Sequence, residues 1–424
     1  MKIFQLSLLL IAVLSVNSQY SQPQVRGNTA FRRISDQLGR PIYNFFRRWF
    51  WIATGSIRDL EEENRKLEIT QHALEKIRPE YVDKFFCDID GPGKRSDAVP
   101  TRVHQLRPGD IDIIGAMGDS LSSANGGYST QPLHLANEFR SIAWSGGGKG
   151  TYFTHVTLPN ILKMFNPKLY GYSTGDGLTI DKSSKFNLAE PMTMSPDLLF
   201  QAKVLINRMR NDGKVDFKNH WKMITIFIGN NDFCSDSCHY ESYEKWVDLH
   251  EKELIKTLRY LRDHVPRLIV NVVGLPDYTN LFKITNSPIR CYVIYRAGCH
   301  CLFQPHMTVE KLGYVKRGVD LWNERDKKIS NMEEFHTNDF AAIYQPFMTN
   351  VTYFVNEKEG IADLRYMAFD CFHFSQLGHA MAALGLWQNL MEPKSNKSDY
   401  WNPNLNKVFK LKCPTEEFPY IRVD

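Results

Sequence analysis

The chain has 424 residues, of which 43% are hydrophobic and 12% are aromatic. This is enough apolar material for a large buried core, in one α/β domain or in two smaller ones. The formal net charge of +5 is spread thinly along the sequence instead of being gathered in blocks, which argues against a nucleic-acid-binding protein.

The first residues predict a signal peptide over residues 1–18. Lys2 provides the positive start, residues 3–16 are largely apolar, and Val16 and Ser18 occupy the −3 and −1 positions of a cleavage site. A buried core helix is the alternative, but the extreme N-terminal position favours a signal peptide. No later stretch approaches the roughly 18 apolar residues that cross a bilayer. We therefore expect a secreted or lumenal, soluble protein with no transmembrane anchor.

Residues 19–90 are expected to form a basic, aromatic arm followed by a helix. The arm contains "FRRISDQLGRPIYNFFRRWFW", a composition that could contact a lipid surface or a partner. A propeptide, or an arm packed on the main domain, explains the same composition equally well. The helix begins where Ser56 can cap it, carries leucines at helical spacing, and ends before Pro79.

The rest of the sequence alternates short apolar runs with helical segments. The runs lie at 111–117, 223–229, 268–274 and 340–347, and helical patterns fall between them, for example at 198–209 and 242–264. This alternation predicts a parallel sheet covered on both faces. The fold class is therefore α/β, a three-layer sandwich with a central parallel sheet flanked by helices. We assign residues 91–395 to this domain and residues 396–424 to a C-terminal tail.

Two serines compete for the role of a catalytic nucleophile. Ser120, in "AMGDSLSSANG", follows a predicted strand and a glycine that permits a tight turn. The residues after Ser120 can begin a helix, whose first N–H groups would face a developing negative charge. Ser173, in "GYSTG", fits the Gly-x-Ser-x-Gly pattern but has no strand before it and no helix after it. We interpret Ser120 as the nucleophile and Ser173 as a turn residue.

Two later segments supply partners for Ser120. Asn231 follows the apolar run in "IFIGNND", where its amide can point at an oxyanion, although Asn-Asp after a strand is also an ordinary turn. Asp370 and His373 stand three residues apart before an apolar helix, a spacing that lets the acid orient the imidazole. His379 is a competing base, but it lies within the helical pattern and has no acid at matching spacing.

Eight cysteines fit an oxidising compartment and favour disulfides over a zinc site. Neither "CSDSCH" nor "CHC" belongs to a paired C-x-x-C array of the kind that binds zinc. The spacing does not determine the pairing, and a close pair such as Cys234 with Cys238 is the simplest guess. Two sequons predict glycosylation at Asn350 and Asn396. The cysteines are Cys87, Cys234, Cys238, Cys291, Cys299, Cys301, Cys371 and Cys413.

These segments together resemble the GDSL, or SGNH, hydrolases, and most closely the phospholipase B branch of that family. The resemblance runs from about Cys87 to the end of the chain and includes "VPTRVHQLRPGDIDIIGAMGDSLSSANG", "WSGGGKGTYFTHVTLPNILKMFNP", "WKMITIFIGNNDFC" and "DCFHFSQLGHA". It implies that Ser120 is the nucleophile, Asp370 the acid and His373 the base. It also implies an oxyanion hole made by Ser120, Gly147 and Asn231, with the register of Gly147 uncertain by one residue.

The resemblance implies a secreted serine hydrolase that releases fatty acids from phospholipids and lysophospholipids. Such a substrate can be met at a membrane surface. No metal or organic cofactor is expected, and no nucleic acid. The residues themselves support only an ester as substrate, so a secreted short-chain or carbohydrate esterase is the alternative. A catalytically silent lipid-binding protein is the rival from another class, and the presence of Ser120, Asp370 and His373 argues against it.

Overall fold

The structure is a computed structural model. It describes residues 84–129, 132–283, 287–303, 308–351, 355–356, 361–362, 364–400 and 411–423. The predicted signal peptide over residues 1–18 lies outside these ranges, and so do the arm and helix as far as residue 83. These assignments therefore stay predictions.

Four parallel strands form the central sheet. They are β1 (Ile111–Gly118), β2 (Trp221–Phe227), β3 (Leu268–Val273) and β4 (Phe340–Gln345), and they lie side by side in that order. In the register of the strands, Ala116 lies opposite Thr225, and Ile224 lies opposite Val270. All four apolar runs are therefore confirmed as strands, and their carboxyl ends meet at the same edge of the sheet.

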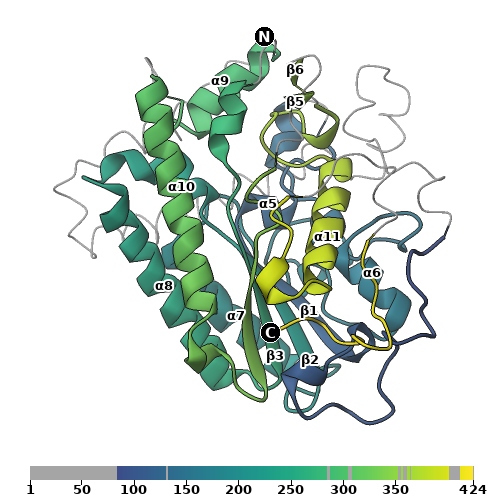
Figure 1. The fold of residues 1–424 in the computed structure, drawn as a ribbon. Helices are drawn as coiled ribbons and strands as arrows, with labels where there is room; N and C mark the ends of the chain where they lie inside the picture. Colours follow the sequence, from purple (N-terminus) through teal and green to yellow (C-terminus); the bar gives the residue numbers. More distant parts are fainter. Residues whose placement is uncertain are drawn as a thin grey trace.

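Helices cover both faces of this sheet (Figure 1). On one face, strand residues such as Ile113 and Met117 share a core with α7 (Leu198–Asn211) and α8 (Tyr243–His264). On the other, residues such as Ile114 pack with α6 (Leu158–Phe165) and α11 (Gln376–Leu390). The three-layer arrangement is confirmed.

The remaining elements surround these layers. The long helix α10 (Val309–Ser330) packs against α8 and β4. The short helix α5 (Ser120–Ser123) follows β1, and α9 (Ile289–Gly298) precedes α10. Two short antiparallel strands, β5 (Val355–Asn356) and β6 (Ile361–Ala362), form a separate pair. None of the helices in the described ranges combines the length and the apolar character needed to span a bilayer.

Helices α8 and α11 begin at residues whose chemistry explains the boundary. The side chain of Ser242 accepts a hydrogen bond from the N–H of Lys245, so it caps α8. The same helix ends just before Pro266, which cannot continue it. Helix α11 begins after Ser375, whose hydroxyl accepts from the N–H of Gly378.

Four disulfides link distant parts of the chain, and no cysteine of the described residues is free. The guessed pair of Cys234 with Cys238 is wrong, because the turn at residues 299–301 folds back against both. The N–H of Cys301 donates to the carbonyl of Cys234 at 2.9 Å. The pairs are Cys87–Cys413, Cys234–Cys299, Cys238–Cys301 and Cys291–Cys371.

The C-terminal segment packs on the domain. The indole N–H of Trp387 donates to the carbonyl of Lys412 at 3.0 Å, and the N–H of Ile421 donates to the carbonyl of Leu106 at 2.7 Å. The Cys87–Cys413 disulfide fixes the same segment to the start of the described chain. The tail that is predicted to begin at residue 396 is therefore held against the domain, at residues 411–423, by hydrogen bonds and by a disulfide.

The turn that ends β1 requires glycine, which gives a stability prediction. Gly118 has a φ of +138°, and a Cβ atom there would lie 2.1 Å from the carbonyl oxygen of Phe227. We expect Gly118→Ala to lower the free energy of unfolding by about 3 kcal/mol, because it adds both a clash and a strained φ. Urea unfolding followed by circular dichroism measures the change.

The matched control is Gly213→Ala, because nothing lies within 4 Å of the added Cβ at that position. This control is expected to unfold at the same urea concentration as the parent protein. Equal stability of the two variants would contradict the described turn.

Candidate active site

Ser120 lies at the sharp turn between β1 and α5. The positive φ of Gly118 turns the chain, and Asp119 then caps the helix by accepting a hydrogen bond from the N–H of Leu121 at 3.0 Å. Ser120 is the first residue of α5, so its N–H has no acceptor within the helix. The Ser120 side chain is 6% exposed. The local sequence therefore presents a nearly buried hydroxyl, with an unused N–H beside it, at the carboxyl edge of the sheet.

A buried hydrogen-bond network holds Asp119 in place. One of its carboxylate oxygens accepts from the side-chain amide of Asn230 at 2.8 Å, and Asn230 in turn accepts from the hydroxyl of Tyr278 at 2.7 Å. Burial raises the pKa of Asp119 to about 6, although the hydrogen bonds from Asn230 and Leu121 oppose that shift. The network connects the turn after β1 with the turn after β2, so the two strand ends keep a fixed relation.

Asp370 and His373 form a close pair in the loop before α11. The Nδ1 atom of His373 lies 2.5 Å from a carboxylate oxygen of Asp370, and the N–H groups of Phe372 and His373 also donate to that carboxylate. Burial alone would lower the pKa of His373, but the negative charges of Asp370 and Asp119 raise it overall. Burial likewise opposes ionisation of Asp370, yet His373 and the backbone donors lower its pKa. The pair is therefore suited to an ionised acid that supports a basic imidazole.

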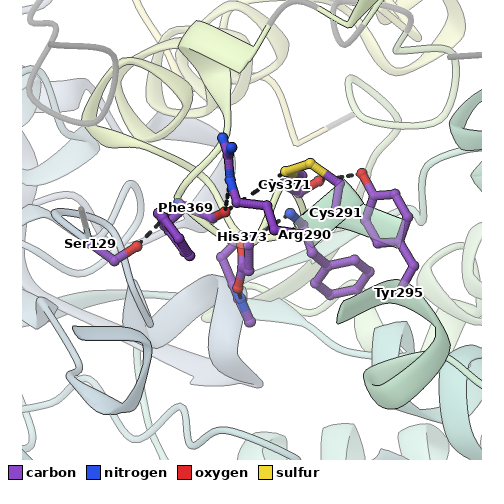
Figure 2. The surroundings of a disulfide bond; sticks show 9 residues. Ser129, Arg290, Cys291, Tyr295, Phe369, Cys371 and His373 are labelled. Atoms are coloured by element: carbon purple, nitrogen blue, oxygen red, sulfur yellow. Dashed lines mark hydrogen bonds and ion pairs between the residues drawn. A yellow bond between two sulfur atoms is a disulfide. The ribbon is translucent and has the colours of Figure 1, made fainter. Parts of the chain in front are cut away.

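Four contacts anchor this loop to other parts of the fold, as Figure 2 shows. The Cys291–Cys371 disulfide ties the residue after Asp370 to α9, and the hydroxyl of Tyr295 donates to the carbonyl of Cys371 at 2.6 Å. The N–H of Phe369 donates to Ser129 at 3.1 Å, while Arg290 donates to the carbonyl of Phe369 at 3.2 Å. Asp370 and His373 are thus positioned by the loop and by the residues that contact it from other parts of the chain.

The Nε2 atom of His373 is ready to accept a proton. It is shielded from solvent and has no hydrogen-bond partner within the described residues. The hydrogen bond from Ser120 to His373 is therefore not formed in this structure. The carboxylate of Asp119, the residue before Ser120, contributes to raising the pKa of His373. Catalytic hydrogen bonds are often long without substrate and tighten when it binds.

The two other predicted oxyanion donors differ in how their hydrogens are used. The side-chain amide of Asn231 donates to the carbonyl of Thr193 at 2.9 Å, which engages one of its two amide hydrogens. The N–H of Gly147 donates to the carbonyl of Ala143 at 2.7 Å. Asn231 thus keeps a hydrogen for another acceptor, whereas the hydrogen of Gly147 is already engaged.

The two residues that the sequence ranked second are both sequestered. Ser173 is fully buried, and its hydroxyl donates to the carbonyl of Ser184 at 2.9 Å. Its backbone pairs with Gly147 in an isolated parallel β-bridge, so the interpretation of Ser173 as a turn residue is wrong. His379 is buried within α11 against the ring of Phe374. Burial lowers the pKa of His379 to about 3, and the charge of the nearby His373 adds to this effect, so the His379 imidazole stays neutral.

A second Ser-His-Asp constellation lies in the core, and the sequence did not reveal it. His250 on α8 lies 2.8 Å from the hydroxyl of Ser195 and 2.7 Å from a carboxylate oxygen of Asp326 on α10. All three residues are buried, and the indole of Trp322 stacks on the imidazole. The N–H of Ser195 also donates to Asp232 at 3.1 Å.

This buried triad cannot meet a substrate, but it supports the site. It fixes the segment that includes Thr193, the acceptor for Asn231, and it joins that segment to α8 and α10. The three residues stand 55 and 76 positions apart in sequence, so no local motif marks them. The available signal in the sequence was that Ser195 and His250 are polar residues at positions that face the core, which indicates a buried hydrogen-bond network.

A separate group of side chains could hold a metal ion. Ligand atoms of Cys238, His239, His300 and Cys301 lie within 4.8 Å of one another. None of these residues belongs to the set of Ser120, Asp370 and His373.

Comparison with known proteins assigns the chain to a family. A family model described as GDSL-like Lipase/Acylhydrolase matches residues 114–386. The chain is 36% identical over 343 residues to "Phospholipase B1, membrane-associated" of Mus musculus, and 37% identical over 335 residues to the protein of the same name from Homo sapiens. These matches cover 80% and 77% of this chain but 22% of each relative.

The chain therefore spans about a fifth of the length of these curated relatives. Among solved structures, an extracellular lipase from Streptomyces rimosus is similar, with 16% identity and a TM-score of 0.32, over 64% of this chain and 95% of that one. At that score the likeness adds nothing to what the parallel sheet itself shows.

The buried triad gives a second stability prediction. We expect His250→Phe to lower the free energy of unfolding by about 3 kcal/mol, because the ring still stacks on Trp322 but Ser195 and Asp326 lose their partner. Urea unfolding at pH 7 measures the loss. The control is His264→Phe at the exposed end of α8, which should change the free energy by less than about 0.5 kcal/mol. Unchanged stability of His250→Phe would show that the triad is not coupled to the fold.

Proposed function

The chain belongs to the GDSL-like lipase/acylhydrolase family of ester-hydrolysing enzymes, and we propose that it releases fatty acids from phospholipids and lysophospholipids. The observation that carries the proposal is the Asp370–His373 pair, in which the Nε2 atom of His373 has no hydrogen-bond partner among the described residues. The charges of Asp370 and of Asp119, next to Ser120, raise the pKa of His373. The substrate class rests on the similarity to proteins named phospholipase B1.

The proposed mechanism is acyl transfer through Ser120. The Oγ atom of Ser120 attacks the ester carbonyl carbon while its proton passes to Nε2 of His373. Asp370 stabilises the resulting imidazolium. The tetrahedral intermediate then collapses, and His373 returns the proton to the departing alcohol. Water repeats the sequence on the acyl-enzyme, which releases the fatty acid and restores Ser120.

Two donors in this structure suit the negative oxygen of the intermediate. They are the N–H of Ser120, at the start of α5, and the second amide hydrogen of Asn231. Gly147 can serve as a third donor only after its N–H turns away from the carbonyl of Ala143. We therefore propose Ser120 and Asn231 as the standing donors and Gly147 as one that substrate binding must recruit.

We also propose that the protein acts outside the cytosol. Four disulfides suggest an extracellular or lumenal fold. The side chains of Asn350 and Asn396 are exposed, so both are open to glycosylation. Secretion itself rests on the predicted signal peptide over residues 1–18, and the membrane surface as the place of action rests on the substrate class.

The function is tested by fatty-acid release from phosphatidylcholine, lysophosphatidylcholine and a short-chain ester. We expect the secreted full chain to act on both lipids, and Ser120→Ala to reduce the rate by about a thousandfold or more. Ser173→Ala is the matched control and should keep its activity, because among the described residues that hydroxyl bonds the carbonyl of Ser184 and no proposed catalytic group.

Each other outcome changes the proposal in a definite way. Hydrolysis of the short ester alone would move the substrate from lipids to the short-chain or carbohydrate esterase class. A folded protein with no hydrolysis of any of the three would favour a lipid-binding protein. Loss of activity in Ser173→Ala together with full activity in Ser120→Ala would overturn the choice of nucleophile.

The raised pKa of His373 predicts the pH dependence. The imidazole must be neutral to take the proton, so kcat/KM should rise with pH through a midpoint above 6.5, the ordinary histidine value. Asp370→Asn should move this midpoint to lower pH, because it removes the charge that raises the pKa. The profile is measured on lysophosphatidylcholine between pH 4 and 9. A midpoint below 6.5 in the parent protein would contradict the described environment.

A further inference from the structure

Two histidines converge where two disulfides join separate segments of the chain. His239 ends the short helix Ser237–His239, and His300 lies in the turn after α9. Cys238, next to His239, is bonded to Cys301, next to His300. A second disulfide, Cys234–Cys299, lies close to the first: Cys234 is four residues before Cys238, and Cys299 is two residues before Cys301. The covalent links therefore hold the two imidazoles in a fixed relation.

The distance between the imidazoles fits two ligands of one metal ion. Their Nε2 atoms lie 3.5 Å apart, and the rings are tilted by 56° with centroids 5.7 Å apart. Histidine nitrogens bind zinc at roughly 2.0–2.1 Å, so two nitrogens 3.5 Å apart subtend about 117° at a shared ion. That angle is close to tetrahedral. Both rings are partly buried, which leaves a route for an ion from solvent.

The neighbouring sulfurs are not the ligands in the oxidised protein. The sulfurs of Cys238 and Cys301 lie within 4.8 Å of the histidine nitrogens, but they are bonded to each other. Zinc binds the thiolate, which a disulfide does not offer. The ion would therefore have two imidazole ligands from the described residues, and water could complete its coordination.

We propose that His239 and His300 form a binding site for a divalent transition metal, with Zn²⁺ or Cu²⁺ as the ions that suit imidazole ligands. Mg²⁺ does not suit the site, because it prefers oxygen ligands. The site does not depend on the proposed lipase function. It joins the end of the segment that starts at Asn231 to the turn after α9, so a bound ion stabilises that junction.

The test uses the full chain with its disulfides intact. Isothermal titration with ZnCl₂ should show one ion per chain, and the melting temperature should rise with ZnCl₂ concentration. MgCl₂ should do neither. His239→Ala and His300→Ala should each abolish the zinc-dependent rise, whereas His264→Ala, at an exposed histidine, should retain it. Circular dichroism and a thiol assay verify that each variant is folded and fully oxidised.

Three results would overturn the proposal. They are the absence of zinc binding to the parent protein, unchanged binding in both histidine variants, and binding that occurs only after a dithiol has reduced the Cys238–Cys301 disulfide. The last result would assign the ion to the two thiolates. If the alanine variants fail to fold, His239→Gln and His300→Gln replace them, since glutamine keeps a polar side chain but no imidazole nitrogen.

Discussion

The backbone of Gly118 ties the turn that carries Ser120 to two neighbouring segments of the chain. Its N–H donates to Gln201 on α7, and its carbonyl accepts from the side chains of Gln201 and Thr193 and from the N–H of Glu190. Because a Cβ would meet the carbonyl of Phe227, the β1 turn can approach β2 this closely only with glycine. The orientation of Ser120 therefore follows from backbone packing between neighbouring strands.

Three buried carboxylates near the carboxyl edge of the sheet have different electrostatic roles. Burial raises the pKa of Asp119 to about 6 and that of Asp232 to about 7, whereas contact with His373 and backbone N–H groups lowers the pKa of Asp370. Asp119 and Asp232 accept hydrogen bonds that hold the strand-end turns. Only Asp370, among these three, is paired directly with the imidazole that carries the proton in the proposed mechanism.

Disulfides connect the loop that contains Asp370 and His373 to the rest of the molecule. Cys371 lies between these two residues, and its bond to Cys291 fixes the loop to α9. The Cys234–Cys299 and Cys238–Cys301 disulfides fix the segment that follows Asn231 to the turn after the same helix. Helix α9 is thus cross-linked to the loop of His373, and the turn that follows it is cross-linked to the segment of Asn231. The cross-links constrain the relative positions of two groups that the proposed mechanism uses together.

The sequence by itself determined the strands and the pairing of Asp370 with His373, and it predicted Ser120 rather than Ser173 as the nucleophile. These features depend on hydrophobic periodicity and on contacts between residues a few positions apart. Only the tertiary structure decided the disulfide partners, the Ser195–His250–Asp326 triad and the bond from Gly147 to Ala143. The first two join residues 55 to 326 positions apart, whose proximity depends on how helices, turns and the C-terminal segment pack against the sheet. The third depends on which acceptor the folded loop brings to an N–H.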